Sequence, residues 1–80
     1  MAWIDDVASA LGETALNEAE TEGLLEAARD IAHRVERKNT PLATFLMGMA
    51  AARAEAAGTT REAAVVSARE TVNSLLPAAE

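Results

Sequence analysis

Apolar side chains recur along this chain with the three- and four-residue spacing of amphipathic helices. The first such stripe contains Trp3, Ile4, Val7 and Leu11, and nothing in that segment alternates with the period of two that marks a strand. Alanine is the commonest residue, and glycine and proline occupy only six positions, which further favours helix. The pattern predicts four helices, over about residues 2–11, 18–38, 41–57 and 60–76.

Residues typical of helix ends lie between these segments. We expect the first helix to stop at Gly12 and the third at Gly58, because glycine is favoured just past a helix end. Either Asn17, followed three residues later by Glu20, or Thr21 alone can accept amide protons from the first turn of the second helix.

The last two helix starts also have sequence signals. Thr40 and Pro41 predict the sharpest boundary, with Thr40 as N-cap and Pro41 as the first helical residue. Thr59 and Glu62 have the spacing of a capping box at the start of the fourth helix, and Pro77 stops that helix.

The third segment is apolar on almost every side. Residues 41–52 contain no charged side chain, and Thr44 is their only polar one. A helix that is apolar all round is usually buried all round, so we expect the other three helices to wrap this one. The predicted fold is all-α: a compact four-helix bundle, forming a single domain over residues 1–80, with the third helix most buried.

Composition and charge exclude several classes of function. The chain has no cysteine and one histidine, so it lacks thiolate chemistry, cysteine metal sites and any pair of histidine ligands. A net charge of −6 argues against nucleic acid as a partner. No serine has a visible histidine–carboxylate relay, and we expect neither enzyme activity nor a cofactor. Acidic residues near the start, and the lack of a long apolar run, predict a cytoplasmic protein that does not contact membranes.

Charge is also unevenly distributed. Residues 1–27 carry seven acidic and no basic side chains, whereas residues 28–80 carry seven basic and six acidic ones. The two parts can attract each other within one chain or between two copies. Gly48, with neighbouring alanines, makes a smooth patch that fits either core packing or a homodimer interface, since small domains are marginally stable alone.

The second predicted helix carries the candidate partner-binding residues. Asp30, His33 and Arg37 are spaced to share one face, and the turn at Thr40 and Pro41 follows them. This surface can bind a protein partner, or it can be an ordinary solvated face with weak charge pairs. Asp30 and His33 supply at most two metal ligands in one chain, so we expect no metal site.

Arg34, Arg37 and Lys38 form the only basic cluster. Together with the free amides at the start of the next helix, they are candidates for binding a phosphate or another anion. Basic residues at a helix C-terminus are equally expected from the helix dipole.

One stretch resembles a known family. Residues 28–37 read ARDIAHRVER and residues 40–48 read TPLATFLMG, which is similar to the signature of a small bacterial domain of unknown function. The opening residues Trp3-Ile4 and Ala10-Leu11-Gly12 are similar to that family as well. Its members occur alone or fused to molybdenum-cofactor guanylyltransferase-like proteins. The resemblance therefore implies an accessory role in molybdopterin-guanine dinucleotide biosynthesis, with no catalytic residue to transfer.

These observations together predict a non-enzymatic interaction or accessory domain that binds a protein partner or a second copy of itself. Two alternatives stay open, a small anion- or nucleotide-binding module and a purely structural homodimer.

Overall fold

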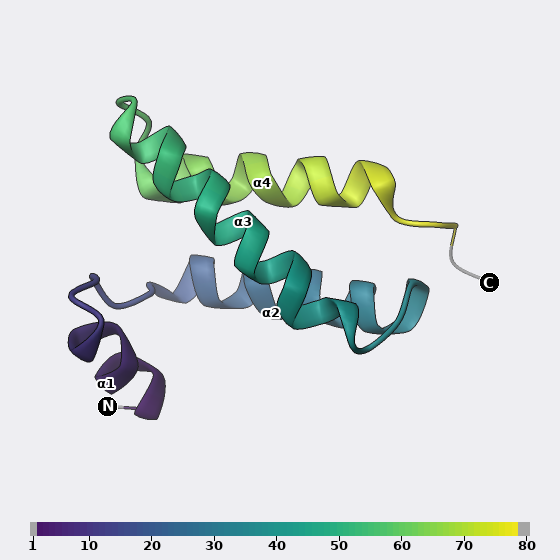
Figure 1. The fold of residues 1–80 in the computed structure, drawn as a ribbon, viewed down its shortest axis with the longest axis horizontal. Helices are drawn as coiled ribbons and strands as arrows, with labels where there is room; N and C mark the ends of the chain where they lie inside the picture. Colours follow the sequence, from purple (N-terminus) through teal and green to yellow (C-terminus); the bar gives the residue numbers. More distant parts are fainter. Residues whose placement is uncertain (1, 79–80) are drawn as a thin grey trace.

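The computed structural model describes residues 2–78, which form four α-helices and no strand. The helices are α1 (Trp3–Ala10), α2 (Glu18–Arg34), α3 (Asn39–Ala56) and α4 (Arg61–Leu75). α2 and α4 pack side by side, and α3 runs diagonally across both of them (Figure 1). The all-α class and the four predicted helices are confirmed.

α3 is the central helix, as predicted, because it packs against both α2 and α4 and makes the most extensive contacts in the bundle. The side chains buried between the three helices are mostly small: Ala27, Ile31, Met47, Ala51, Ala64 and Val65. Small side chains let helices approach closely, but each one removes little apolar surface from water. The core therefore leaves much of the chain's larger apolar surface uncovered.

The expectation that α3 is wrapped on every side is wrong. Leu42, Phe45, Leu46 and Met49 are between 52% and 67% exposed. α2 and α4 lie in one layer and cover one side of α3 (Figure 1). α1 packs against none of the other three helices, so within residues 2–78 it does not cover the opposite side.

α1 stands apart from the three packed helices (Figure 1). None of its residues is buried, and Trp3 is 75% exposed. Its predicted apolar stripe exists as a helical face, with Ile4 and Leu11 also exposed and Val7 half-buried. No other described helix packs against that stripe.

Local signals placed three boundaries correctly. Asn17 caps α2: its Oδ1 accepts from the Glu20 amide at 2.7 Å, and a Glu20 carboxylate oxygen accepts from the Asn17 amide at 2.9 Å. Gly12 and Gly58 follow the ends of α1 and α3 with φ values of +75° and +111°. Only glycine adopts such angles without strain, so both predicted stops are confirmed.

The predicted boundary between the second and third helices is wrong by several residues. α2 ends at Arg34 rather than at residue 38. The next residue, Val35, still donates its amide to the Ile31 carbonyl, but its φ and ψ of −121° and −94° leave the helical region. Residues 35–38 form a turn instead of a last helical turn.

α3 begins two residues before the predicted start, with Lys38 as N-cap and Pro41 as its third residue. The amides of Asn39 and Thr40 donate to the turn carbonyls of Glu36 and Arg37, each at 3.1 Å, which starts the helix early. Proline fits there because amides of the first helical turn have no intrahelical partner to lose.

The predicted capping box of Thr59 and Glu62 is wrong, because α4 begins one residue later and Ala63 takes the position expected for Glu62. Thr60 is the N-cap of α4, and its hydroxyl accepts from the Ala63 amide at 3.2 Å. The Thr59 amide bonds back to the Ala54 carbonyl at 3.0 Å, so this residue closes α3 instead of opening α4.

The Arg69 side chain of α4 packs over Gly23 of α2. A Cβ atom built on Gly23 would lie 2.7 Å from Nη1 and 3.1 Å from Cδ of Arg69. The Arg69 side chain continues over α2 to Glu26, where its Nη2 donates to the carboxylate at 3.1 Å. Gly23 thus provides the space in which Arg69 spans α2.

We expect Gly23→Ala to stabilise the chain by clearly less than the gain of about 1 kcal/mol that the helix propensity of alanine provides, because the added methyl group displaces the flexible Arg69 side chain. Gly48→Ala is the matched control in α3. Nothing lies within 4 Å of its Cβ position, and helix propensity should raise stability by about 1 kcal/mol. Urea unfolding measures both variants. Equal stabilisation by both would show that Arg69 does not pack over Gly23.

Candidate interaction surface

The most unusual surface of the chain is the exposed side of α3. Leu42, Phe45, Leu46 and Met49, here termed the apolar face of α3, follow the i, i+3, i+4, i+7 spacing of one helical stripe. No charged residue occurs between positions 39 and 52. Fully burying a side chain of this size contributes about 1.5–3 kcal/mol. Covering this face would therefore stabilise any complex that forms there.

An open groove of about 550 Å³ adjoins this face, between α3 and α4. We term it the α3–α4 groove. Its larger apolar lining residues are Ile31, Val35, Leu46, Met47, Val72, Leu75 and Leu76. Leu46 belongs to both surfaces, so the groove and the apolar face of α3 are continuous.

A second groove, of about 340 Å³, lies on the other side of α3. It is lined by Leu24 of α2, by Gly48 and Ala51 of α3, and by Glu13 and Leu16 of the segment between α1 and α2. α3 is therefore flanked by open apolar space on both sides and exposed along its outer edge.

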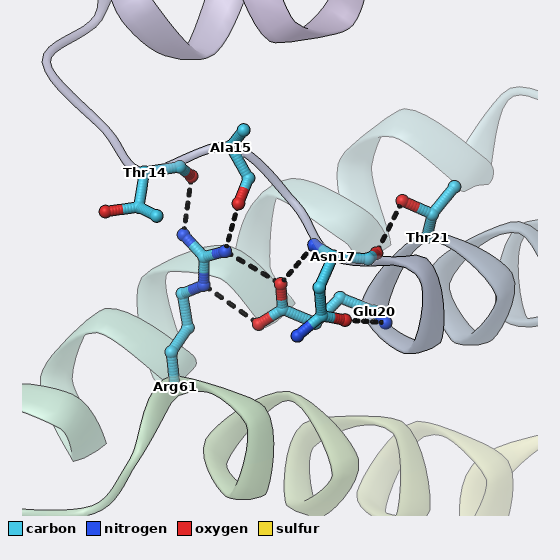
Figure 2. Close-up of polar contacts among 6 residues, drawn as sticks. All are labelled: Thr14, Ala15, Asn17, Glu20, Thr21 and Arg61. Atoms are coloured by element: carbon cyan, nitrogen blue, oxygen red, sulfur yellow. Dashed lines mark hydrogen bonds and ion pairs between the residues drawn. The ribbon is translucent and has the colours of Figure 1, made fainter.

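The strongest polar cluster is an ion pair between α2 and α4 (Figure 2). Arg61 donates from Nε and Nη2 to the two carboxylate oxygens of Glu20, at 2.8 and 2.7 Å. It also donates to the carbonyls of Thr14 and Ala15, at 2.6 and 2.7 Å. We call these contacts the Arg61 clamp. The Glu20 side chain is only 2% exposed. Through Arg61, the clamp joins three parts of the chain: the α1–α2 linker, the start of α2 and the start of α4.

The hydrogen bonds from Arg61 lower the pKa of Glu20 against the opposing effect of burial, and the Asn17 amide lowers it further. Glu20 is therefore charged and already bound to groups of its own chain. The clamp joins the α1–α2 linker to α4.

Sequence reasoning identified Glu20 only as a cap and missed Arg61, whose partner lies far away in the chain. One signal was present: Arg61 is the first residue of α4, where the helix dipole disfavours a cation. A basic residue at that position indicates a nearby acidic partner.

The structure separates the predicted partner-binding residues. Asp30 is half-buried and His33 exposed on α2, whereas Arg37 lies in the turn beyond the helix. The three do not share one helix face, because α2 ends before Arg37. The Thr40 hydroxyl donates to the Ala28 carbonyl at 3.4 Å and ties α3 to α2, and Pro41 is exposed.

The predicted anion-binding residues differ in how far they are engaged by their own chain. Arg34 donates from Nε to the Pro77 carbonyl at 2.8 Å, beyond the end of α4. Lys38 pairs loosely with Glu36 at 3.7 Å, and Arg37 is exposed. Within residues 2–78 no group of three potential metal ligands comes together, and none of the helices has the length and apolarity needed to cross a bilayer.

The sequence model of a protein family matches the whole chain, residues 1–80, and that family is described as a domain of unknown function, DUF6457. The match confirms the resemblance to a small domain of unknown function. No curated protein and no solved structure matches.

Proposed function

Since the chain belongs to the DUF6457 family, a domain with no activity assigned, we propose its function from its surfaces. It is a non-enzymatic interaction domain that binds a protein partner through the apolar face of α3. The observation that carries this proposal is the exposure of Leu42, Phe45, Leu46 and Met49 on the part of α3 that has no charged residue, residues 39–52.

Exposed apolar surface of this kind marks binding sites. Contiguous apolar patches are uncommon on monomeric proteins and are usually covered by a partner. A stripe with i, i+3, i+4, i+7 spacing beside an apolar groove fits an amphipathic partner helix. By contrast, the buried carboxylate of Glu20 is fully engaged by Arg61 and by the backbone of its own chain, which favours binding over catalysis.

The resemblance of residues 28–48 supports a more specific partner. We propose that the bound protein is a guanylyltransferase-like protein of molybdopterin-guanine dinucleotide biosynthesis. Anion binding is the weaker alternative, because Arg34 is engaged by the Pro77 carbonyl and only Arg37 and Lys38 of the basic cluster stay well exposed.

Affinity capture from an extract of the source cells, read by mass spectrometry, tests this proposal. We expect the wild-type chain to capture a guanylyltransferase-like protein and Leu42→Ser/Phe45→Ser to reduce its recovery at least about tenfold, as loss of two buried anchors does. Both side chains are more than half exposed, so the substitutions should leave the fold intact.

Asp30→Ala/His33→Ala is the control, because it removes the polar surface predicted on α2. Recovery that falls with this variant and not with Leu42→Ser/Phe45→Ser would move the binding site to α2. If the wild-type chain captures no specific protein, the proposed function is wrong.

A further inference from the structure

We propose that α1 of a second copy of this chain occupies the α3–α4 groove, so that two copies exchange their N-terminal helices. This inference goes beyond the proposed function: it assigns the α3–α4 groove to a second copy and leaves the apolar face of α3 to the other protein. It follows from two parts of the chain that each lack a partner within residues 2–78, an apolar helix and an apolar groove.

α1 has the properties of a helix that binds in a groove. Its eight residues span about 12 Å, and Trp3, Ile4 and Leu11 present an exposed apolar stripe. A helix this short is marginal in water unless its apolar side packs against something. The isolated position of α1 in the chain provides no such packing (Figure 1).

The groove has the complementary shape. Much of its lining is small, which leaves room for large side chains from outside: Ala43, Ala50, Ala54, Ala64, Ser67 and Ala68. The tryptophan and isoleucine of α1 are the kind of large side chains that such a surface accepts.

The same chain's α1 cannot reach this groove while the Arg61 clamp is closed. The clamp fixes the carbonyls of Thr14 and Ala15, and residues 11–13 between them and α1 span at most about 11 Å. Glu13 and Leu16 line the groove on the opposite side of α3. α3 therefore stands between its own α1 and the α3–α4 groove, whereas a second copy meets no such obstacle.

Charge favours a second copy and gives α1 a direction. α1 carries Asp5 and Asp6 in its first turn and no basic residue. Val35, Asn39 and Leu76 line one end of the groove, and Arg34, Arg37 and Lys38 flank Val35 and Asn39 in the chain. The bond from Arg34 to the Pro77 carbonyl also holds this cation beside Leu76. We therefore expect the acidic first turn of α1 to lie at the basic end of the groove, so that Ala10, at the other end of α1, lies near Ser67. If each copy places its α1 in the groove of the other, the two copies form a dimer with twofold symmetry.

Sedimentation velocity of the full chain over a range of concentrations tests the pair. We expect a species of about twice 8.4 kDa for the wild type. Trp3→Asp should weaken dimerisation about thirtyfold or more, as loss of a central aromatic anchor does. Ser9→Asp adds the same charge to α1 outside its apolar stripe and should change dimerisation little.

Disulfide trapping tests the position of α1, because the natural chain has no cysteine. After mixing, oxidation should link an Ala10→Cys chain to a Ser67→Cys chain in preference to either homodimer. A Glu70→Cys chain is the control, since Glu70 is exposed on α4 and does not line the groove. It should not link to Ala10→Cys.

A chain that stays monomeric at all concentrations, or a dimer that Trp3→Asp leaves unchanged, would overturn the exchange of α1. Equal linking of Ala10→Cys to Ser67→Cys and Glu70→Cys would do the same. The proposed function would still stand after these outcomes if Leu42→Ser/Phe45→Ser reduces capture of a different protein. If that variant captures the other protein as well as the wild type does, while the chain still dimerises, only the proposed function is wrong.

Discussion

Replacing Arg61 with alanine is expected to lower the free energy of unfolding by about 3–5 kcal/mol, the cost of leaving a buried charge without its partner. The Glu20 carboxylate is almost inaccessible to water and receives two hydrogen bonds from Arg61. The variant also frees the Thr14 and Ala15 carbonyls, which lose the donor that holds the linker.

An effect of this size is large for this domain. A single core in a chain of this length supplies only about 3–5 kcal/mol of net stability, and here most of the core residues are alanine or valine. Arg61→Ala should therefore leave a substantial fraction of the chain unfolded at room temperature. Urea unfolding followed by circular dichroism measures this change.

Arg29→Ala is the control for Arg61→Ala. Arg29 is exposed on α2, and a surface substitution of this kind changes stability by about 0.5 kcal/mol or less. Similar losses for the two variants would mean that the Arg61 clamp contributes no more than an ordinary surface charge.

The same ion pair makes stability depend on pH. Arg61 lowers the folded pKa of Glu20 below its ordinary value of 4.5. The contribution of Glu20 is therefore complete above the unfolded pKa and is lost as the pH falls through the lower folded pKa. Glu20→Gln keeps a side chain that can complete the α2 cap but removes this titration. Below about pH 4.5 the stability of the wild type should fall more steeply than that of Glu20→Gln.

The features that sequence predicted well are local. Asn17 and Glu20 are three residues apart, and Gly12 and Gly58 end helices through their own backbone angles. Such signals need no knowledge of the rest of the fold. Arg61 is the contrasting case, because its partner is 41 residues away and no local pattern specifies which acidic residue it meets.

The candidate surface was harder to predict for a related reason. An apolar stripe on a helix indicates that this side of the helix is covered, but it does not specify which element covers it. The apolar stripe of α1 therefore predicts packing inside the bundle, which the structure does not show. Arg37 was placed on the face of α2 because no local signal marked the end of that helix at Arg34. For α3, apolar residues occur on every side of the helix, so the sequence does not indicate which side faces the core.

The two methionines of α3 now test which side of that helix faces the core. Met47 is 4% exposed and lines the grooves on both sides of α3, whereas Met49, two residues later, is 52% exposed. Met47→Ala is expected to lower the free energy of unfolding by about 2–5 kcal/mol, because it opens a cavity at the crossing of the helices. Met49→Ala makes the same chemical change on the apolar face of α3 and should cost less than about 1 kcal/mol in the monomer.

Urea unfolding of both variants at low protein concentration measures this difference. A larger loss of stability for Met49→Ala than for Met47→Ala would mean that α3 presents its other side to α2 and α4. Repeating the measurement at higher concentration adds a second readout. A second copy whose α1 fills the α3–α4 groove binds only the folded chain, so it stabilises the native state by mass action. Met47 lines that groove, so the cost of Met47→Ala should grow with protein concentration. Met49 does not line it, so the cost of Met49→Ala should stay nearly constant.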